Sequence, residues 1–476
     1  MDYKSTIMNW FDVNGCHMTE ISDKIWNYAE TLFQEYQSSA ILADELEQSG
    51  FRVTRGVADI ETAFTAEWSN GNGPVIALLG EYDALPGLGN ELVPEKKPNG
   101  KNGHGCGHNL LGVGSMAAAI SLRQAMIEHD VKGTIRYYGC PAEEGGGAKV
   151  FMVRDGLFRD IDAVVRWHPI HITHVPLSPC FSTRRGVCIF RNKSQYLGLG
   201  NGSQLGRNAL NAAILMDLAV NYLKDNVPKS ATLRTMITKA GVNIGVNPTE
   251  VEVQFRCNTT EGEEATEIFE RMVQVAKGVA AATGTEVEIR CTMATTRTLP
   301  NKVLCEAMLK NLQEVGPPAF TQEDKDFAAK MTEHLDQNVK ARSILMFGIT
   351  DPEVSRKPLH EGISTDMLEN IPVTAYCTDS GDVSWQAPMC QSFVAGQPIG
   401  STNHSWQQVV SSGMGIGHAC LLTAGKTIAM TAMNILTDPY LLEQAKKEFD
   451  QKLKEHPYVC PIPDYAKPGA SYAYLD

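Results

Sequence analysis

Apolar and polar residues are arranged along the first part of the chain in a pattern that predicts strands connected by helices. Pro74 to Gly80 is an almost purely aliphatic run, as is typical of a strand buried on both faces. Leu110 to His129 is rich in small residues and predicts a helix. Gly133 to Cys140 and Ile161 to Trp167 are β-branched and aromatic runs that predict two more strands. Strands that alternate with helices in this way predict a largely parallel sheet.

The two ends of the chain fit the same α/β style. Met18 to Gln48 has apolar residues at turn spacing, and we expect one amphipathic helix there. Near the other end, Ser392 to Ala395 predicts a strand and Gly413 to Leu436 a helix. The stretch from Pro317 to Asn370 is charged and irregular, and its pattern predicts no particular element.

The middle of the chain, from about Gly186 to Cys291, has a different pattern. Its expected elements are the strand V-C-I-F, a helix Asn208 to Lys224, strands Thr232 to Thr238 and Thr249 to Arg256, a helix Glu261 to Thr283 and a strand Glu286 to Arg290. This order is that of a ferredoxin-like α+β domain. Because it interrupts two α/β stretches, we expect an inserted domain at 186–292, between the two parts of the first domain at 1–185 and 293–476.

Composition narrows the class of protein. The chain has 476 residues, more than one ordinary core accommodates, and its 43% hydrophobic and 20% charged content is that of a globular protein. Its 42 basic and 55 acidic residues give a net charge of −13, which argues against nucleic acid or an anionic membrane as a partner. The N-terminus shows no signal-peptide pattern, so we expect a cytoplasmic protein with reduced cysteines.

Potential metal ligands follow the predicted strands at five places, where open α/β sheets position their sites. The motifs are G-E-Y-D-A-L-P with Glu81 and Asp83, G-H-G-C-G-H-N with His104, Cys106 and His108, C-P-A-E-E-G-G-G with Glu143 and Glu144, R-W-H-P with His168, and T-N-H-S-W with His404. Each motif alone has an ordinary interpretation as a turn or a solvated helix start. Five such motifs together fit a single cluster better than five coincidences.

The types of side chain in these motifs indicate the type of metal. Imidazole, thiolate and carboxylate together suit zinc or a neighbouring transition metal, whereas magnesium and calcium prefer oxygen alone. A divalent metal lowers the pKa of bound water from about 15.7 to about 7, and one of two adjacent glutamates can then accept the proton. The pattern therefore indicates hydrolysis of an amide or a similar bond. A cysteine hydrolase with Cys106 as nucleophile and His108 as base is a weaker alternative, because it leaves Glu144, His168 and His404 unexplained.

The same motifs, with Y-Y-G-C-P-A-E-E-G-G and S-G-D-V-S-W, closely resemble the aminoacylase/carboxypeptidase family of two-metal amidohydrolases over almost the whole chain. The resemblance implies a catalytic domain interrupted by a lid that also forms a homodimer, two zinc or manganese ions per chain, and an acyl-amino acid substrate of the aminobenzoyl-glutamate type. It implies the following residue roles: Cys106, His108, Glu144, His168 and His404 as metal ligands, Glu143 as general base and acid, Asp83 as the residue that orients a ligand, and Arg256 as a substrate-carboxylate contact.

The lid departs from the family pattern at one place. Family members carry a histidine there that reaches across the dimer to the oxyanion, but the matching stretch from Phe190 to Arg207 contains none. Tyr196 and Asn201 are the polar side chains that we consider as replacements. Three alternatives stay open: a dipeptidase for short basic or β-alanyl dipeptides, a catalytically impaired metal-binding relative, and an enzyme that needs a second type of subunit.

Overall fold

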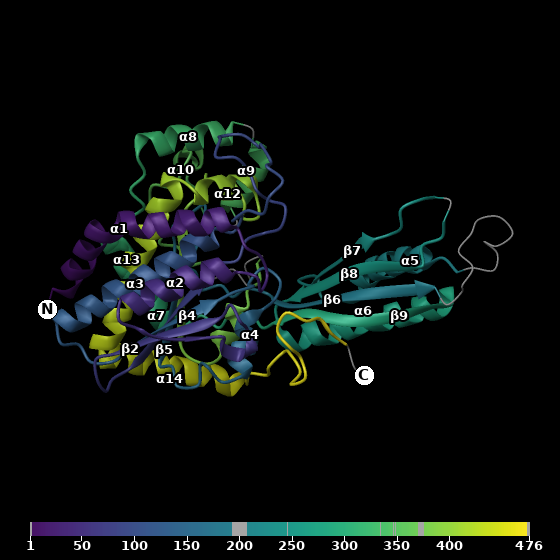
Figure 1. Cartoon of the computed structure of the whole chain (residues 1–476), viewed down its shortest axis with the longest axis horizontal. Coiled ribbons are helices and arrows are strands. Elements are labelled where there is room, and N and C mark those ends of the chain that lie inside the picture. The colour runs from purple at the N-terminus through teal and green to yellow at the C-terminus, as the bar shows by residue number, and fades with distance from the viewer. Residues whose placement is uncertain are drawn as a thin grey trace.

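The computed structural model describes residues 2–192, 207–244, 246–333, 335–345, 347, 349–369 and 376–473, which form two domains. In Figure 1 the larger domain lies on the left and the smaller one extends to the right as a separate lobe. The larger domain contains the two α/β stretches that precede and follow the smaller domain in the sequence, including the C-terminal helices. The chain passes into the smaller domain after residue 181 and returns after residue 295.

A six-stranded mixed sheet forms the centre of the larger domain. Its order is β1 (Arg52–Arg55), β2 (Phe64–Ser69), β4 (Thr134–Cys140), β3 (Val75–Glu81), β5 (Ala163–Ile170) and β10 (Met389–Ala395). The pairs β3–β4, β3–β5 and β5–β10 are parallel, whereas β1–β2 and β2–β4 are antiparallel. The carboxyl ends of the parallel strands therefore meet at one edge, as the sequence predicts.

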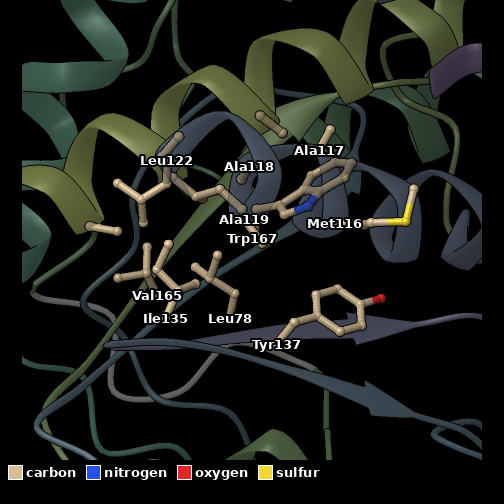
Figure 2. Packing of buried hydrophobic residues seen from close by; sticks show 14 of the residues in the cluster. Leu78, Met116, Ala117, Ala118, Ala119, Leu122, Ile135, Tyr137, Val165 and Trp167 are labelled. Atoms are coloured by element: carbon tan, nitrogen blue, oxygen red, sulfur yellow. The ribbon is translucent and has the colours of Figure 1, made fainter. Parts of the chain in front are cut away.

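Long helices cover one face of this sheet. They are α1 (Tyr3–Tyr28), α3 (His108–Glu128) and α13 (Gly415–Thr437), with α7 (Lys302–Val315) and α14 (Pro439–Glu455) beside them. Figure 2 shows Ala117, Ala118 and Leu122 of α3 packed over Leu78 and Val165 of the sheet. Small side chains let α3 approach closely: a Cβ at Gly112 would lie 2.7 Å from the carbonyl oxygen of Glu81. The helix α3 therefore holds its N-terminus against the end of β3.

Helices α3 and α13 are long and apolar enough to cross a membrane by length and composition. Most of each helix is buried inside the larger domain, against the sheet and against each other. The helix expected at Gly413 to Leu436 is thus a core helix, and its burial accounts for its apolar composition.

The prediction of one helix from Met18 to Gln48 is wrong. The chain forms α1 and α2 (Tyr36–Gln48), with a break that begins at Ala29 (φ 44°) and includes Phe33 (φ 61°). The carboxylate of Glu30 accepts hydrogen bonds from the backbone of α2, at 3.0 Å from Gln37 N. The break carries no glycine or proline, so the apolar spacing alone concealed it.

The other face of the sheet is covered by shorter elements. These are the 3₁₀ turn η1 (Val57–Asp59), α4 (Ala148–Arg154) and α11 (Ser380–Val383). Their apolar side chains pack with Leu79 and Tyr138 of the sheet. Both α4 and α11 follow loops at the carboxyl edge of the sheet, so this face also supports the candidate site.

The smaller domain has the predicted ferredoxin-like order. Its strands β6 (Ser182–Asn192), β7 (Thr232–Lys239), β8 (Glu250–Thr259) and β9 (Thr285–Thr295) are all antiparallel, with α5 (Ala209–Leu223), η3 (Lys224–Asn226) and α6 (Gly262–Thr283) between them. The sheet order is β11-β9-β6-β8-β7, in which β11 (Tyr472–Ala473) is a strand that the sequence pattern did not predict. Helices α5 and α6 pack on one face, around Phe255 and Met272. Within the described residues, the opposite face of this sheet carries no helix of its own domain.

The stretch from Pro317 to Asn370, which the sequence left without assignment, contains three helices in its described part. They are α8 (Gln322–Thr332), α9 (Gln337–Leu345) and α10 (Pro352–Arg356), and Figure 1 shows them grouped at the top of the larger domain near α12 (Trp406–Ser412). A capping box on Thr321 and Asp324 begins α8, and Pro352 begins α10.

Candidate active site

The structure brings the residues of all five sequence motifs together at the carboxyl edge of the larger sheet. Asp83 follows β3, the pair Glu143 and Glu144 follows β4, and His168 lies near the end of β5. Cys106 and His108 come from the turn that begins α3, and His404 from the loop between β10 and α12. All of these positions except that of His404 lie near strand or helix ends. Parallel strands and their crossover helices bring such ends together at one edge of the sheet.

The potential ligand atoms of the described residues form three groups: two share the sulfur of Cys106, and the third joins Glu81, His108 and Glu143. The donor atoms of Cys106, His108 and His168 all lie within 4.8 Å of one another, and so do those of Cys106, Glu144 and His404. Cys106 Sγ lies 3.5 Å from His168 Nε2, and His404 Nε2 lies 3.1 Å from Glu144 Oε2. Because Cys106 belongs to two of these groups, its sulfur would be available as a ligand to an ion in either one.

Hydrogen bonds hold the imidazole rings with one nitrogen directed into the cluster. His108 Nδ1 donates to Asp83 Oδ1 at 2.7 Å, and His168 Nδ1 donates to the carbonyl oxygen of its neighbour Pro169 at 2.9 Å. Asp83 Oδ2 also accepts a hydrogen bond from Glu144 N at 2.9 Å, so one carboxylate positions two members of the cluster. Such hydrogen bonds fix the tautomer and orientation of a metal-ligating histidine.

Two atoms of the cluster are buried without a hydrogen-bond partner among the described residues. They are His108 Nε2 and Glu144 Oε1. A buried polar atom without a hydrogen-bond partner costs about 1–3 kcal/mol, and a bound cation would offset that cost. The donor set of sulfur, imidazole nitrogen and carboxylate oxygen fits a transition metal.

The backbone of the cluster loops adopts uncommon conformations. His404 has φ 61°, and its N–H donates to the carbonyl oxygen of Gly105 at 2.6 Å. Ala142, directly before Glu143, has φ 55°, and its N–H donates to Glu35 Oε1 at 3.0 Å. Left-handed conformations of residues with a Cβ are strained and concentrate at functional sites. Glu35 is fully buried and was not recognised from the sequence.

Burial and neighbouring charges set the protonation of the cluster. Burial, followed by the negative charges of Glu81 and Asp379, raises the pKa of Glu143 well above its usual value. Burial also raises the pKa of Glu144, to about 7. Burial alone would raise the pKa of the Cys106 thiol, but the charges of His108 and His168 outweigh it and hold that pKa well below its usual value. The cluster thus favours a thiolate at Cys106 and a carboxyl that readily holds a proton at Glu143.

A buried network of ion pairs supports the cluster from below, and sequence reasoning missed it. Lys149 Nζ lies 2.6 Å from Asp379 Oδ1 and 2.8 Å from Glu81 Oε1, and Arg166 Nη2 lies 3.4 Å from the same Glu81 oxygen. Burial raises the pKa of Glu81, but the positive charges of Lys149 and Arg166 outweigh it and lower that pKa. A lysine in a short helix normally faces solvent, so the sequence around Lys149 did not indicate a buried ion pair. The only sequence signal for this network was the position of Asp379 next to the S-G-D-V-S-W motif.

Two candidates of the sequence motifs have other partners. Glu81 pairs with Lys149 and Arg166, but it also belongs to the third group, with its Oε2 3.4 Å from His108 Nε2. His104 lies outside all three of the three-residue groups, and its Nε2 is 3.1 Å from the carbonyl oxygen of Ile25. Burial lowers the pKa of His104 to about 4, so the ring is neutral. It ties the glycine-rich turn to α1.

A cavity of about 750 Å³ opens over the cluster, between the two domains. Apolar and aromatic side chains form one part of its wall: Ile170, Met293, Phe347, Tyr376 and Phe393. Arg185 and Arg256 of the smaller domain line another part. Helix α9 contributes Val339, Arg342 and Ser343. Tyr196 and Asn201, the proposed replacements for the missing lid histidine, lie outside the described residues.

Comparisons with known proteins agree with this arrangement. Residues 77–377 match the model of peptidase family M20/M25/M40. The chain is 37% identical to one of the subunits of p-aminobenzoyl-glutamate hydrolase from Escherichia coli (strain K12), over 95% of each chain, and 26% identical to the Xaa-Arg dipeptidase of Mus musculus, over 91% of this chain and 89% of that one. The structure of a dinuclear metal-binding peptidase of the M20 family from Bacillus subtilis has a similar fold, with a TM-score of 0.52 and 17% identity over 88% of this chain and 99% of that one.

The strand-end cluster, the inserted ferredoxin-like domain and the family match over most of the chain support the same conclusion. The fold is that of a mostly parallel α/β domain with an inserted α+β domain, as the sequence predicted. The chain belongs to the M20/M25/M40 family of peptidases and is an amidohydrolase.

Proposed function

We propose that this amidohydrolase cleaves the amide bond between an aromatic acyl group and an amino acid, with p-aminobenzoyl-glutamate as its model substrate. The observation that carries the proposal is the cavity itself. Its lining includes residues of the ligand cluster, aromatic side chains and the two arginines of the smaller domain. The aromatic side chains match an aryl group, the ligand cluster matches an amide, and the arginines match a carboxylate.

Two divalent transition-metal ions, zinc or manganese, would be held by the cluster. Cys106, His108 and His168 would hold one, and Cys106, Glu144 and His404 the other. When bound, such ions polarise an amide carbonyl and make water a better nucleophile at neutral pH. Asp83 contributes from outside the cluster, because it keeps His108 Nε2 directed inward and fixes the backbone of Glu144.

Glu143 is the residue we propose as general base and acid. Its carboxyl lines the cavity, and its Oε2 lies 4.0 Å from His108 Nε2. Burial, followed by the charges of Glu81 and Asp379, raises the pKa of Glu143, so its carboxylate is a stronger base than that of a solvated glutamate. In its ionised form Glu143 can accept a proton at its carboxylate from the attacking water, and in its protonated form it can pass that proton to the leaving nitrogen.

The dipeptidase alternative has weaker support. The Xaa-Arg dipeptidase shares 26% identity with this chain, against 37% for the p-aminobenzoyl-glutamate hydrolase subunit. A basic leaving amino acid would also place its positive charge near Arg185 and Arg256. The catalytically impaired alternative concerns the histidine-free stretch, most of which lies outside the described residues.

The smaller domain offers a surface for the homodimer that we propose. On α5, Ile214, Leu218 and Tyr222 recur every four residues and are exposed. β7 is an edge strand, whereas β11 covers the other edge of the sheet. Exposed apolar side chains beside a free edge are typical of a protein interface. Light scattering of Leu218→Glu should show a monomer where the parent is a dimer; a monomeric parent would contradict the proposal and would make a second type of subunit the better candidate.

Location in the cytoplasm also stays a proposal. None of the twelve cysteines forms a disulfide, and nine of them are buried. Reduced, buried thiols are typical of proteins from a reducing compartment.

The direct test of the proposed reaction is a substrate comparison on the metal-replete protein. We expect turnover of p-aminobenzoyl-glutamate and benzoyl-glutamate at a higher kcat/KM than of alanyl-arginine or β-alanyl-lysine. A preference for the basic dipeptides would instead select the dipeptidase. Absence of turnover on all four would favour the impaired relative.

A further inference from the structure

Three arginines lie next to one another on the helix-free face of the smaller domain. Arg185 of β6 pairs in register with Arg256 of β8, and Arg256 pairs in turn with Arg234 of β7. Side chains alternate between the two faces of a sheet. The neighbours Phe255 and Leu233 pack against α5 and α6, so the three arginines point to the other face. We call these three residues the arginine row.

The arginine row has no acidic partner among the described residues. Arg185 donates one hydrogen bond, from Nη2 to the neutral Gln254 Oε1 at 3.2 Å, and no carboxylate of the described chain pairs with any of the three. By contrast, Arg191 on the same strand pairs with Glu250 at 2.9 Å and also with Glu288.

Like charges on adjacent strands destabilise a sheet. Burial lowers the pKa of Arg185, and the positive charge of Arg256 lowers it further. The fold therefore keeps two cations close together at a cost that an anionic ligand would remove.

The inner two members of the arginine row face the candidate active site. Arg185 and Arg256 line the cavity, whereas Arg234 is exposed outside it. A Cβ built on Gly145 would lie 3.3 Å from Arg185 Nη1. The Arg185 guanidinium thus lies against the loop that carries Glu143 and Glu144, within reach of a group attached to the amide that these residues act on.

We propose that Arg185 is a specificity-determining residue, which together with Arg256 binds an amino-acid portion that carries two carboxylates. The inference rests on the proposed function, because it assigns the acidic end of that substrate to named side chains. A guanidinium binds a carboxylate through two parallel hydrogen bonds. One carboxylate neutralises one arginine, so two arginines on adjacent strands are matched by two carboxylates joined by a short aliphatic chain. Cross-strand neighbours have Cβ atoms about 4.5–5.5 Å apart, which suits an acid of glutamate size.

The test is a calorimetric titration of the full metal-replete protein with glutarate, a dicarboxylate, and with butyrate, a monocarboxylate. We expect Arg185→Gln to weaken glutarate binding about 10- to 100-fold, the usual effect of losing hydrogen bonds to a charged group. Butyrate binding should change less than about threefold, because Arg256 still pairs with one carboxylate. Arg191→Gln is the matched control, since it removes an arginine from the same strand outside the cavity, and it should bind both probes like the parent.

Two outcomes would overturn the inference. One is glutarate binding to Arg185→Gln with the affinity of the parent, and the other is an equal loss for butyrate. Should Arg185→Gln fail to fold, Arg185→Lys decides, because lysine keeps the charge but loses the paired hydrogen bonds. We then expect glutarate binding to weaken about tenfold, and unchanged affinity would contradict the inference.

Turnover separates this inference from the proposed function. In the parent we expect a higher kcat/KM for benzoyl-glutamate than for benzoyl-norvaline. Arg185→Gln should reduce the difference between the two kcat/KM values, mainly by raising the KM for benzoyl-glutamate. A parent that cleaves neither compound would refute the proposed reaction, while the glutarate titration would still decide the role of Arg185.

Discussion

Replacement of Lys149 by methionine tests whether the ion pairs below the cluster carry stability. Lys149 is fully buried, and its ammonium is the cation between Asp379 at 2.6 Å and Glu81 at 2.8 Å. Methionine has a similar length and fills the same space without the charge. The variant therefore leaves two carboxylates buried, with Arg166 at 3.4 Å as the remaining cation beside Glu81.

The expected loss is large because burial amplifies each charge. Removing one partner of a buried ion pair typically costs about 3–5 kcal/mol. A pair at about 4 Å in an effective dielectric of about 20 gives a similar value, about 4 kcal/mol. We expect the free energy of unfolding of Lys149→Met to fall by about 3–5 kcal/mol at pH 8, measured by urea titration followed by circular dichroism.

The loss should depend on pH, with a defined sign. Without Lys149 the pKa values of Asp379 and Glu81 rise in the folded state, so the folded variant binds more protons than the unfolded chain. Its stability therefore falls as pH rises, and the difference from the parent should be larger at pH 8 than at pH 5.

The matched control is Lys239→Met, which breaks an ion pair to Glu250 that is also 2.8 Å long but exposed. Exposed pairs contribute about 0–1 kcal/mol, so this control should unfold nearly like the parent. A loss below about 1 kcal/mol in Lys149→Met, or a loss equal to that of the control, would refute the argument that the buried network is stabilising.

Two further predictions concern chemistry and acid stability. Glu143→Gln should lower turnover about 100- to 10,000-fold while the metal content stays unchanged, and loss of metal would mean that the roles of Glu143 and Glu144 are exchanged. Burial, followed by the charges of His171 and His360, lowers the pKa of His174 to about 3, so this ring resists protonation until the chain unfolds. Stability should consequently decrease as pH falls below about 6.5, and His174→Leu should make that decrease shallower by about 1.4 kcal/mol per pH unit between pH 5.5 and 4. An unchanged slope in urea titrations would contradict this.

The sequence predicted those features that depend on short-range patterns. Aliphatic runs identified the parallel strands, and ligand-type residues directly after those strands identified the cluster. Cys106, His108, Glu144, His168 and His404 indeed converge, although their roles as ligands stay predictions. The order of elements also identified the ferredoxin-like domain.

Other features depend on contacts between distant residues, and no local pattern revealed them. The break after α1 is stabilised by hydrogen bonds to Glu30 and Glu35, which apolar spacing cannot detect. The pairing of Lys149 with Asp379 joins residues 230 positions apart. No sequence pattern indicated Arg185, whose register with Arg256 is a contact between distant residues.

The metal content of the purified chain tests the central claim most directly, namely that Cys106 and its four partners form one two-metal centre. Mass spectrometry of metals after metal-replete purification should find about two transition-metal ions per chain, and Cys106→Ala should lose much of that metal because the Cys106 sulfur belongs to two of the three groups. Chelation should abolish turnover, and zinc, manganese or cobalt should restore it. Fewer than about one ion per chain in the parent, or full retention of metal in Cys106→Ala, would contradict the claim.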